Sequence, residues 1–442
     1  MPAPHRPPRI PGPQGLPLLG SALHLLRDPL DYARRCAHTY GDVVQIGFLG
    51  QRTILVSHPE DIRTVLHTQQ RNFRKPAFHR GFSALLGRGL IISDGAHWRR
   101  QRTMVNPALH GPRLAEYGTI ALSAVESLIH RWSPGGPRDL HADFMKLSLE
   151  VIARSLFGTE LFAEEIVQLL DAVLRHYLSI TRYALPDGIP SPGSIRTRNA
   201  LRRLDELLAR IIEGRRASRT SGSDILGSLL EARDSSGHAM SDRDLRDEIV
   251  TLLLAGHETA ALVLTYTTHL LARHPEIAGR FAAESDALGR IPSPADLPKL
   301  PFAIQVVHES MRLYPPAWGI SRESIAPCRI GGHAIPGGAQ ISMLPWIVHR
   351  DRRWFPHPER FDPERWSESG AKSLHRFAYF PFGHGPRICA GNEFAMTEIV
   401  LILARLSQRF RWRLLDARPL RFAPSITLRP KRPVYVEVLP RT

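Results

Sequence analysis

A single cysteine lies in a glycine-rich segment directly before a predicted helix. The segment YFPFGHGPRICAGNEFAM (379–396) places Cys389 among Gly383, Gly385 and Gly391. Glycine allows close backbone approach and positive φ, and the unpaired N–H groups and dipole at a helix N-terminus stabilise a thiolate. We therefore expect a thiol of low pKa that can bind a metal ion. An isolated cysteine is more often a small core residue, but this setting favours a metal ligand.

An acid and a hydroxyl stand side by side in a long apolar helical stretch. Glu258 and Thr259 follow Ala255 and Gly256, whose small side chains leave room for a bulky group against the helix. An acid beside a hydroxyl can move protons. The alternative is structural: the threonine hydroxyl would bond the carbonyl four residues earlier in its own helix.

Two further pairs share single helix faces. Glu309 and Arg312 are three residues apart, and Trp98 and Arg102 are four apart, spacings that bring side chains together on a helix. Glu-x-x-Arg alone is weak evidence, because the same spacing recurs at residues 60–63 and 213–216. An exposed pair of this kind contributes only about 0.2–1 kcal/mol. The 309–312 pair differs because LYPP follows it and the cysteine segment lies downstream.

Together these motifs resemble those of the cytochrome P-450 family. The family's haem-binding signature, F-G-x-G-x-R-x-C-x-G, is matched at each fixed position by Phe382, Gly383, Gly385, Arg387, Cys389 and Gly391. The resemblance implies that Cys389 is the proximal iron ligand of haem b (iron protoporphyrin IX). It also implies that Phe382 packs beside the sulfur, that Arg387 pairs with a haem propionate and that Gly391 completes the cofactor-binding loop. A thiolate ligand pushes electron density toward iron and favours O–O cleavage.

The acid–hydroxyl stretch resembles the family's oxygen-binding groove, A/G-G-x-D/E-T. By this resemblance Glu258 and Thr259 are the catalytic residues that deliver protons to bound dioxygen, while Ala255 and Gly256 lie against the cofactor. The residue after the threonine is often a second hydroxyl in the family, whereas here it is Ala260.

Other arginines resemble the family's haem-binding and structural residues. Trp98 and Arg102 resemble a W-x-x-x-R helix whose N–H groups donate to the haem propionates, and Arg322 resembles another propionate partner. The guanidinium fork suits carboxylates because it can bind them bidentately. Separately, the helix at 309–312 resembles the family's E-x-x-R helix, so Glu309 and Arg312 are expected in a buried structural triad. FDPERW (361–366) makes Arg365 the expected third member, with Arg360 as its rival.

The sequence pattern predicts a mainly helical α+β fold with small β-sheets, and the resemblance implies the cytochrome P-450 fold with a long central helix over the haem. We expect helices at 28–41, 242–273, 302–314 and 392–409, and a hairpin centred on residues 49–51. Shorter strands are expected within 317–348 and 411–438. A helical region from about 94 to 290 should be broken mainly by a mobile connection at 185–194. We expect a Pro/Gly-rich N-terminal extension (1–27) followed by one haem-binding domain (28–442).

Composition limits the partners and the cellular location. The net charge is +16, and residues 401–442 carry ten Arg or Lys against two acids. A generic basic surface explains this about as well as a docking face for an acidic protein, and no nucleic-acid motif is present. Three widely spaced cysteines argue against disulfides. No signal-like or membrane-spanning segment is apparent, so we expect a cytoplasmic protein without a membrane anchor.

The predicted function is a haem-dependent monooxygenase. It would insert one oxygen atom of O2 into a small hydrophobic substrate that is lipid-like, terpenoid or aromatic, using electrons from a separate ferredoxin or flavodoxin and its NAD(P)H reductase. The resemblance places the pocket at 78–90, 252–256, 317–320 and 425–427. The alternatives are a haem enzyme that needs no reductase, a thiol hydrolase using Cys389 with His384, and a non-catalytic haem carrier.

Overall fold

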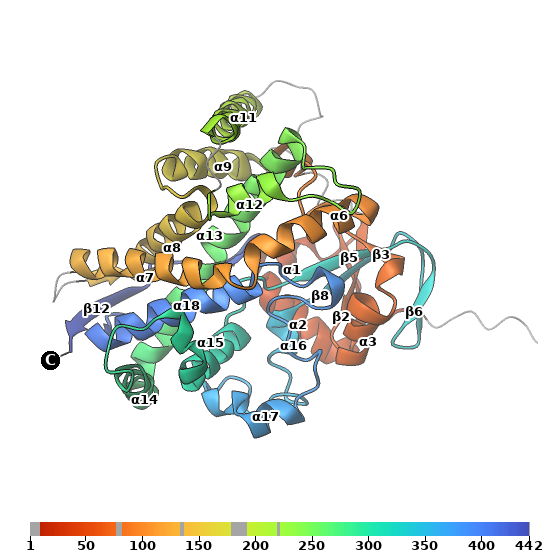
Figure 1. The fold of residues 1–442 in the computed structure, drawn as a ribbon. Helices are drawn as coiled ribbons and strands as arrows, with labels where there is room; N and C mark the ends of the chain where they lie inside the picture. Colours follow the sequence, from red (N-terminus) through yellow and green to blue (C-terminus); the bar gives the residue numbers. More distant parts are fainter. Residues whose placement is uncertain (1–8, 77–81, 133–136, 178–191, 219–221, 442) are drawn as a thin grey trace, which may run out of the picture.

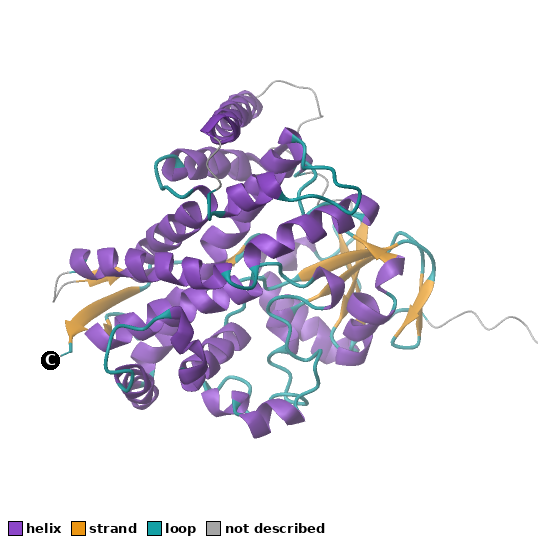
Figure 2. Cartoon of the chain, viewed as in Figure 1, coloured by secondary structure: helices purple, strands orange, loops and turns teal. Residues whose placement is uncertain are grey.

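Helices form most of the molecule, and a mixed sheet lies at one side of it (Figure 1, Figure 2). The computed structural model describes residues 9–76, 82–132, 137–177, 192–218 and 222–441. This arrangement confirms the predicted mainly helical α+β class.

The long helix α13 (Asp242–Arg273) runs through the helical part. The Ser241 hydroxyl caps its start by accepting a hydrogen bond from the Asp244 N–H at 3.1 Å, and Pro275 opens the next helix. Both ends are those predicted. Of the helices described, α13 alone is long and apolar enough to cross a membrane, but 72% of its apolar stretch is buried inside the protein. Its composition is therefore explained by its place in the core.

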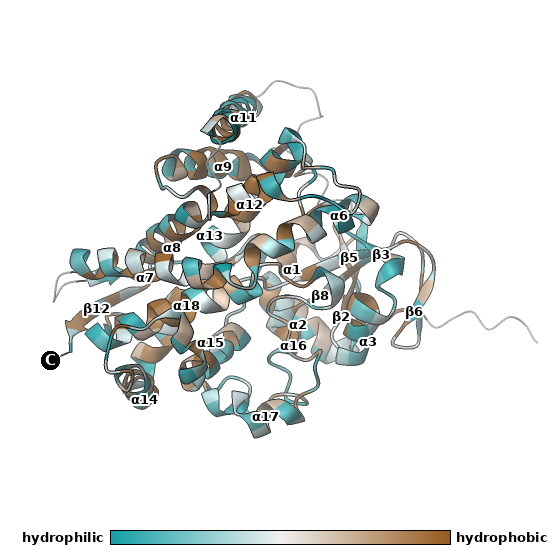
Figure 3. Ribbon diagram, viewed as in Figure 1, coloured by the Kyte–Doolittle hydropathy of each residue, from teal (hydrophilic) through white to brown (hydrophobic). Residues whose placement is uncertain are grey.

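The other helices pack around α13 in pairs. Helix α8 (Leu140–Phe157) packs against α13, α18 (Asn392–Arg409) against α7 (Arg113–Arg131), and α9 (Ala163–Tyr177) against α11 (Pro192–Ser218). Hydrophobic residues line helices such as α8 and α12, which lie within this group (Figure 3). The remaining helices are α1 (Ala22–Arg27), α2 (Pro29–Tyr40), α3 (Pro59–Arg63), α5 (Ser83–Leu86), α6 (Gly95–Val105), α12 (Ile225–Glu231), α14 (Pro275–Asp286), α15 (Pro301–Leu313), α16 (Pro345–Val348) and α17 (Glu368–Ser373).

A five-stranded sheet joins the beginning of the chain to its second half, in the order β1-β2-β8-β5-β3. Strands β1 (Val43–Phe48) and β2 (Gln51–Val56) form the predicted hairpin, with Leu49 and Gly50 at positive φ in its turn. Strand β2 pairs in parallel with β8 (Gln340–Met343). Strand β5 (Ile320–Ser324) then connects β8 to β3 (Phe73–Arg74).

Three smaller sheets complete the fold. Strand β12 (Tyr435–Pro440) lies between β4 (Pro137–Asp139) and β9 (Phe410–Leu414). Strands β6 (Cys328–Ile330) and β7 (His333–Ile335) form one hairpin, and β10 (Phe422–Pro424) and β11 (Leu428–Pro430) form another.

The prediction of a helical region from about 94 to 290 is partly wrong. Besides the expected break, β4 interrupts it, α8 ends at Gly158 in a left-handed conformation, and an isolated bridge joins Arg233 to Ala239. These breaks depend on local turns and on a strand partner near the C-terminus. The expected connection at 185–194 lies mostly outside the described residues, which resume with α11 at Pro192.

Candidate active site

The cysteine segment forms a tight loop in front of α18. Gly383 and Gly385 have φ values of 73° and 68°, which side chains other than glycine rarely adopt. A Cβ atom on Gly385 would lie 2.0 Å from the carbonyl oxygen of Leu66, so only glycine fits this contact. The Cys389 N–H donates to the Phe382 carbonyl at 2.8 Å. These contacts fix the cysteine backbone at the helix entrance.

The Cys389 side chain is accessible to solvent, yet protein atoms surround it on most sides. Burial raises the pKa of the Cys389 thiol, while the Gly391 N–H and the charge of Arg102 lower it. The expected low pKa is therefore wrong for the thiol in this structure, because burial outweighs the donors near the helix end.

An accessible stripe interrupts the buried surface of α13. Leu252, Ala255, Gly256 and Thr259 are partly or fully accessible, although most residues between them are buried. Their spacing puts them on one helix face. The Thr259 hydroxyl donates to the Ala255 carbonyl at 2.6 Å. The back-bonded alternative considered for this threonine is thus the arrangement observed.

Buried positive charges collect beside the cysteine loop. The Arg387 guanidinium donates to the Ser93 carbonyl at 3.0 Å and pairs with Asp94. The backbone N–H of Lys75 donates to the same Asp94 carboxylate at 3.0 Å. Burial and the charge of Arg387 lower the pKa of Arg322 to about 10. Burial, Arg322 and Arg387 together hold the pKa of Lys75 well below its usual range.

The two predicted residues of α6 lie beside this cluster. The Arg387 guanidinium stacks on the Trp98 ring, 4.3 Å from its centroid. Burial lowers the pKa of Arg102 and the nearby Cys389 raises it. Within the described part of the chain, the Arg102 guanidinium has no hydrogen-bonding partner, and Arg322 donates only to the carbonyl of the preceding Ser321, at 2.8 Å.

These residues fit haem. Lys75, Arg322 and Arg387 lie around a single carboxylate, Asp94, so basic groups are in excess over acids in a buried place. Such an excess is costly unless anions neutralise it, and the two propionates of haem would supply that charge. The accessible thiol of Cys389 and the accessible stripe of α13 offer a ligand and a surface for the ring. Cys389, Trp98, Arg102, Arg322 and Arg387 would hold the group.

Glu258 points away from Thr259 toward the C-terminal hairpin. Its carboxylate accepts hydrogen bonds from both Nε and Nη2 of Arg429 in β11, the second at 2.9 Å. Glu258 is buried, whereas the Arg429 side chain is 44% exposed. The ion pair therefore connects the interior of α13 to the surface. The sequence-based interpretation did not include Arg429.

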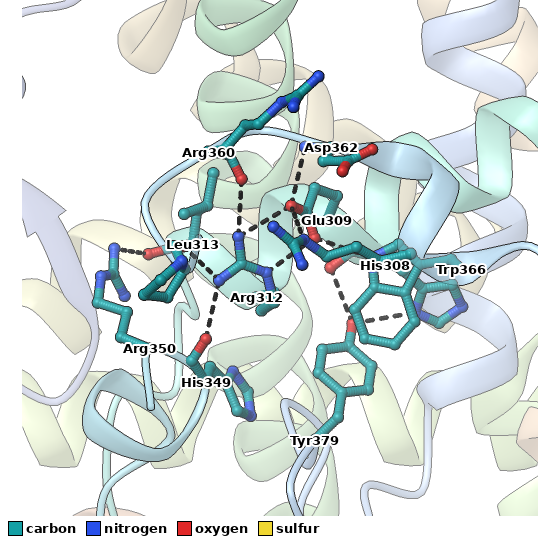
Figure 4. Close-up of polar contacts among 12 residues, drawn as sticks. His308, Glu309, Arg312, Leu313, His349, Arg350, Arg360, Asp362, Trp366 and Tyr379 are labelled. Carbon is teal, nitrogen blue, oxygen red and sulfur yellow. Dashed lines mark hydrogen bonds and ion pairs between the residues drawn. The ribbon is translucent and has the colours of Figure 1, made fainter. Parts of the chain in front are cut away.

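Glu309 and Arg312 form a fully buried pair (Figure 4). The Arg312 Nε and Nη2 groups donate to the two Glu309 carboxylate oxygens at 2.8 Å. The remaining donors reach the carbonyls of His349, Pro358 and Arg360 at 2.6–3.0 Å.

The geometry favours Arg365 over Arg360 as the third member of this group. The Arg365 Nε lies 3.4 Å from Glu309, whereas Arg360 contributes its backbone carbonyl and its guanidinium points away (Figure 4). Glu309 also accepts from Asp362 N–H and from Trp366 Nε1. This network ties α15 to the segment that leads into the cysteine loop.

The structure describes most of the segments that were expected to line the pocket. Residues 78–81 lie outside the described residues, whereas 82–90 pack on α13: the N–H of Arg88 donates to Asp247 at 2.7 Å, and that of Leu90 to Glu248 at 3.2 Å. Residues 317–320 and 425–427 are neighbours, because Trp318 Nε1 donates to the Ser425 carbonyl at 3.0 Å. Of residues 252–256, Leu252, Ala255 and Gly256 belong to the accessible stripe, whereas Leu253 is fully buried.

Sequence reasoning missed Lys75, Asp94 and Arg429. Lys75 and Asp94 come from the chain before α6, and only the tertiary structure brings them to Arg387. For Arg429 a signal existed in the sequence. A basic residue between Leu428 and Pro430 in a predicted strand needs a partner if its side chain turns inward.

Three comparisons bear on this site. The family description named Cytochrome P450 matches residues 10–438. Cyclooctat-9-en-7-ol 5-monooxygenase from Streptomyces melanosporofaciens is 37% identical over 415 residues, covering 91% of this chain and 89% of that protein. Pentalenene oxygenase from Streptomyces avermitilis is 32% identical and covers 90% of both chains. The solved structure of retinoic acid-bound cyanobacterial CYP120A1 superposes with a TM-score of 0.89 at 29% identity, covering 99% of this chain and 100% of the other.

Proposed function

We propose that this chain, which belongs to the cytochrome P450 family, hydroxylates a cyclic terpene or a similar hydrophobic hydrocarbon. As a member of that family it is a haem-thiolate monooxygenase, an oxidoreductase that uses O2. One observation carries the assignment to this site: the accessible Cys389 thiol lies beside a buried cluster in which Lys75, Arg322 and Arg387 share one carboxylate, Asp94.

When bound, haem b would supply the iron chemistry that activates O2 and inserts one oxygen atom into the substrate. In this proposal the Cys389 sulfur would bind the iron, and the loop from Phe382 to Gly391 fixes the position of that sulfur. Arg322, Arg387 and the Trp98–Arg102 pair hold the propionates. Phe382 packs beside the sulfur, and Ala255 and Gly256 allow the ring to approach α13.

Proton delivery is assigned to Glu258 and Thr259. Thr259 lies on the accessible face of α13, and Glu258 reaches the surface through its pair with Arg429. Because the Glu258 carboxylate is bound to Arg429 and points away from Thr259, it would have to leave Arg429 and turn toward the hydroxyl to pass on a proton taken from solvent. The Thr259 hydroxyl must exchange its bond to the Ala255 carbonyl for one to the reacting oxygen, which needs only a rotation about χ1.

The substrate class follows from the pocket and the relatives. The accessible stripe of α13 is apolar apart from Thr259, and an apolar wall favours hydrocarbon ligands. Two relatives are named for oxidation of cyclooctat-9-en-7-ol and pentalenene, and a structural neighbour binds retinoic acid.

The electrons would come from a ferredoxin or flavodoxin with its NAD(P)H reductase. The +16 net charge suits an acidic partner. Reduction that is equally fast at low and high salt would contradict electrostatic docking.

The experiment combines three measurements on the purified holoenzyme. The reduced protein with carbon monoxide should give the band of a haem-thiolate rather than a haem-histidine protein. Cyclic terpene hydrocarbons should shift the spin state of the ferric enzyme, and turnover under ¹⁸O2 should place one labelled atom in the product. A thiolate spectrum without any terpene-induced shift would refute the substrate class, and a histidine-type spectrum would refute the site. Turnover that needs only peroxide would identify the reductase-independent alternative.

A further inference from the structure

A hollow lies far along α13 from the candidate active site. Its volume is about 380 Å³, and it opens between the loop after β9 and the loop between β11 and β12. His269 contributes its wall from α13, ten residues beyond Thr259, which corresponds to about 15 Å along the helix axis. None of the haem-holding residues proposed above lines this hollow.

His269 is an unpartnered polar group at this place. Its side chain is only 2% exposed, and neither ring nitrogen has a hydrogen-bonding partner in the described part of the chain. Burial, reinforced by Arg273 and His274, lowers the pKa of His269 to about 4. The ring is therefore neutral near pH 7, with one N–H to donate and one nitrogen to accept. Buried polar groups in native proteins normally have a partner.

The rim of the hollow is cationic. Arg418, Arg421 and Arg432 line it together with one acid, Asp416. Asp416 is already occupied, because Arg418 binds it through two nitrogens at 2.7–3.0 Å. The side chains of Arg421 and Arg432 have no hydrogen-bonding or ion-pair partner among the residues that the structure describes. Arg432 also interacts with Asp416 at longer range, so one carboxylate is set against three guanidinium groups on the rim.

Apolar side chains complete the wall. Leucine, proline and valine residues and Tyr435 supply the rest of the lining. The volume exceeds what a single small anion needs and falls in the range of about 300–1,000 Å³ found for small-molecule sites. A ligand that uses the whole hollow would thus have an anionic end and an apolar part.

We propose that this hollow binds an organic oxyanion, a small molecule with a phosphate or carboxylate group next to an apolar portion. Arg421 and Arg432 would bind the anionic oxygens, because guanidinium matches their geometry bidentately. Both ring nitrogens of His269 are buried, so its ring would turn toward the hollow for the N–H to donate to one oxygen at the floor, and the apolar lining would cover the rest. The bound molecule would connect α13 to the loops of β9 to β12.

The test is a calorimetric titration of the holoenzyme with phenyl phosphate, benzoate, inorganic phosphate and neutral benzyl alcohol. We expect saturable binding of phenyl phosphate or benzoate without change in the haem absorption, since the site is remote from the haem; the better of the two identifies the anion. Arg421→Gln/Arg432→Gln should weaken binding at least tenfold, and His269→Phe should also weaken it. Because His269→Phe changes a buried residue and could disturb folding, Arg421→Gln/Arg432→Gln is the decisive variant.

A charge-matched control comes from the end of α18 and the adjoining start of β9. Arg409→Gln/Arg411→Gln removes the same charge from exposed positions that do not line the hollow, and it should leave the affinity unchanged. Equal loss in this control would mean general charge attraction and would overturn the site. Absence of saturable binding by both aromatic anions, equal binding of benzyl alcohol, or crystals soaked in phenyl phosphate that show only water on His269 would overturn it too.

Discussion

Replacing Arg312 by methionine should destabilise the protein severely. The arginine is fully buried and donates five hydrogen bonds, two to Glu309 and three to backbone carbonyls. Methionine fills a similar volume but leaves the buried Glu309 carboxylate with only Arg365, Trp366 and the Asp362 N–H. Removing one member of a buried ion pair costs roughly 3–5 kcal/mol, a large part of the roughly 5–15 kcal/mol that stabilises a typical domain.

The chain provides a matched control with the same spacing at its surface. Arg63 lies 2.8 Å from Glu60, as close as Arg312 lies to Glu309, but the two side chains are 51% and 49% exposed. Exposed pairs contribute about 0–1 kcal/mol, so Arg63→Met should change stability by no more than that. The two variants therefore differ in burial while sharing sequence motif and ion-pair distance.

The assay is urea-induced unfolding followed by far-UV circular dichroism, with haem content measured in parallel. Arg312→Met should lower the midpoint strongly and reduce haem incorporation, because the carbonyls it binds belong to the segment leading to the cysteine loop. A loss below about 1 kcal/mol, or equal losses in the two variants, would refute the argument that burial makes this pair important.

Three other changes have distinct expected results. Cys389→Ser should keep the fold by circular dichroism but lose the carbon monoxide band of a haem-thiolate, and retention of that band would exclude Cys389 as the ligand. Glu258→Gln should lower the product formed per NAD(P)H by about tenfold or more, and Arg429→Gln should lower it by less. In both variants the electrons that do not form product should appear as hydrogen peroxide. An unchanged yield of product per NAD(P)H in both variants would show that Glu258 does not deliver protons. Burial raises the pKa of Glu398 from 4.5 to about 8, so the folded state retains a proton that the unfolded state releases. The stability that this group contributes is fully present below pH 4.5 and is lost as pH rises toward 8. In urea unfolding at a series of pH values, Glu398→Gln should make the free energy of unfolding fall less steeply with pH. An unaltered dependence on pH would show that Glu398 is not the cause.

The best sequence predictions concerned features with local causes. The ends of α13 depend on Ser241 and on the His274–Pro275 pair, and the β1–β2 hairpin depends on the Leu49–Gly50 turn. The loop before α18 was recognisable because its glycines adopt the positive φ that its tight contacts require.

Features that depend on contacts between distant parts of the chain were harder to predict from the sequence. The Glu258–Arg429 pair joins residues 171 positions apart, and the cationic cluster joins Lys75 to Arg322 and Arg387. No local pattern determines such contacts. The expected pKa of Cys389 was wrong for the same reason: the helix end is a local feature, whereas burial depends on the whole fold.

Strand pairing also determines when the protein can finish folding during synthesis. Strand β2 must wait for β8, nearly 290 residues later, and β4 must wait for β12 at the C-terminal end. Pairings this distant are slow to form, and an unpaired strand edge can associate with other chains. Until the ribosome has released the last strand, the three-stranded sheet lacks its middle member. A truncation before Tyr435 removes residues 435–442 and with them β12, and it should therefore leave a nascent-like, aggregation-prone chain. It would nevertheless spare every residue assigned here to haem binding and proton delivery.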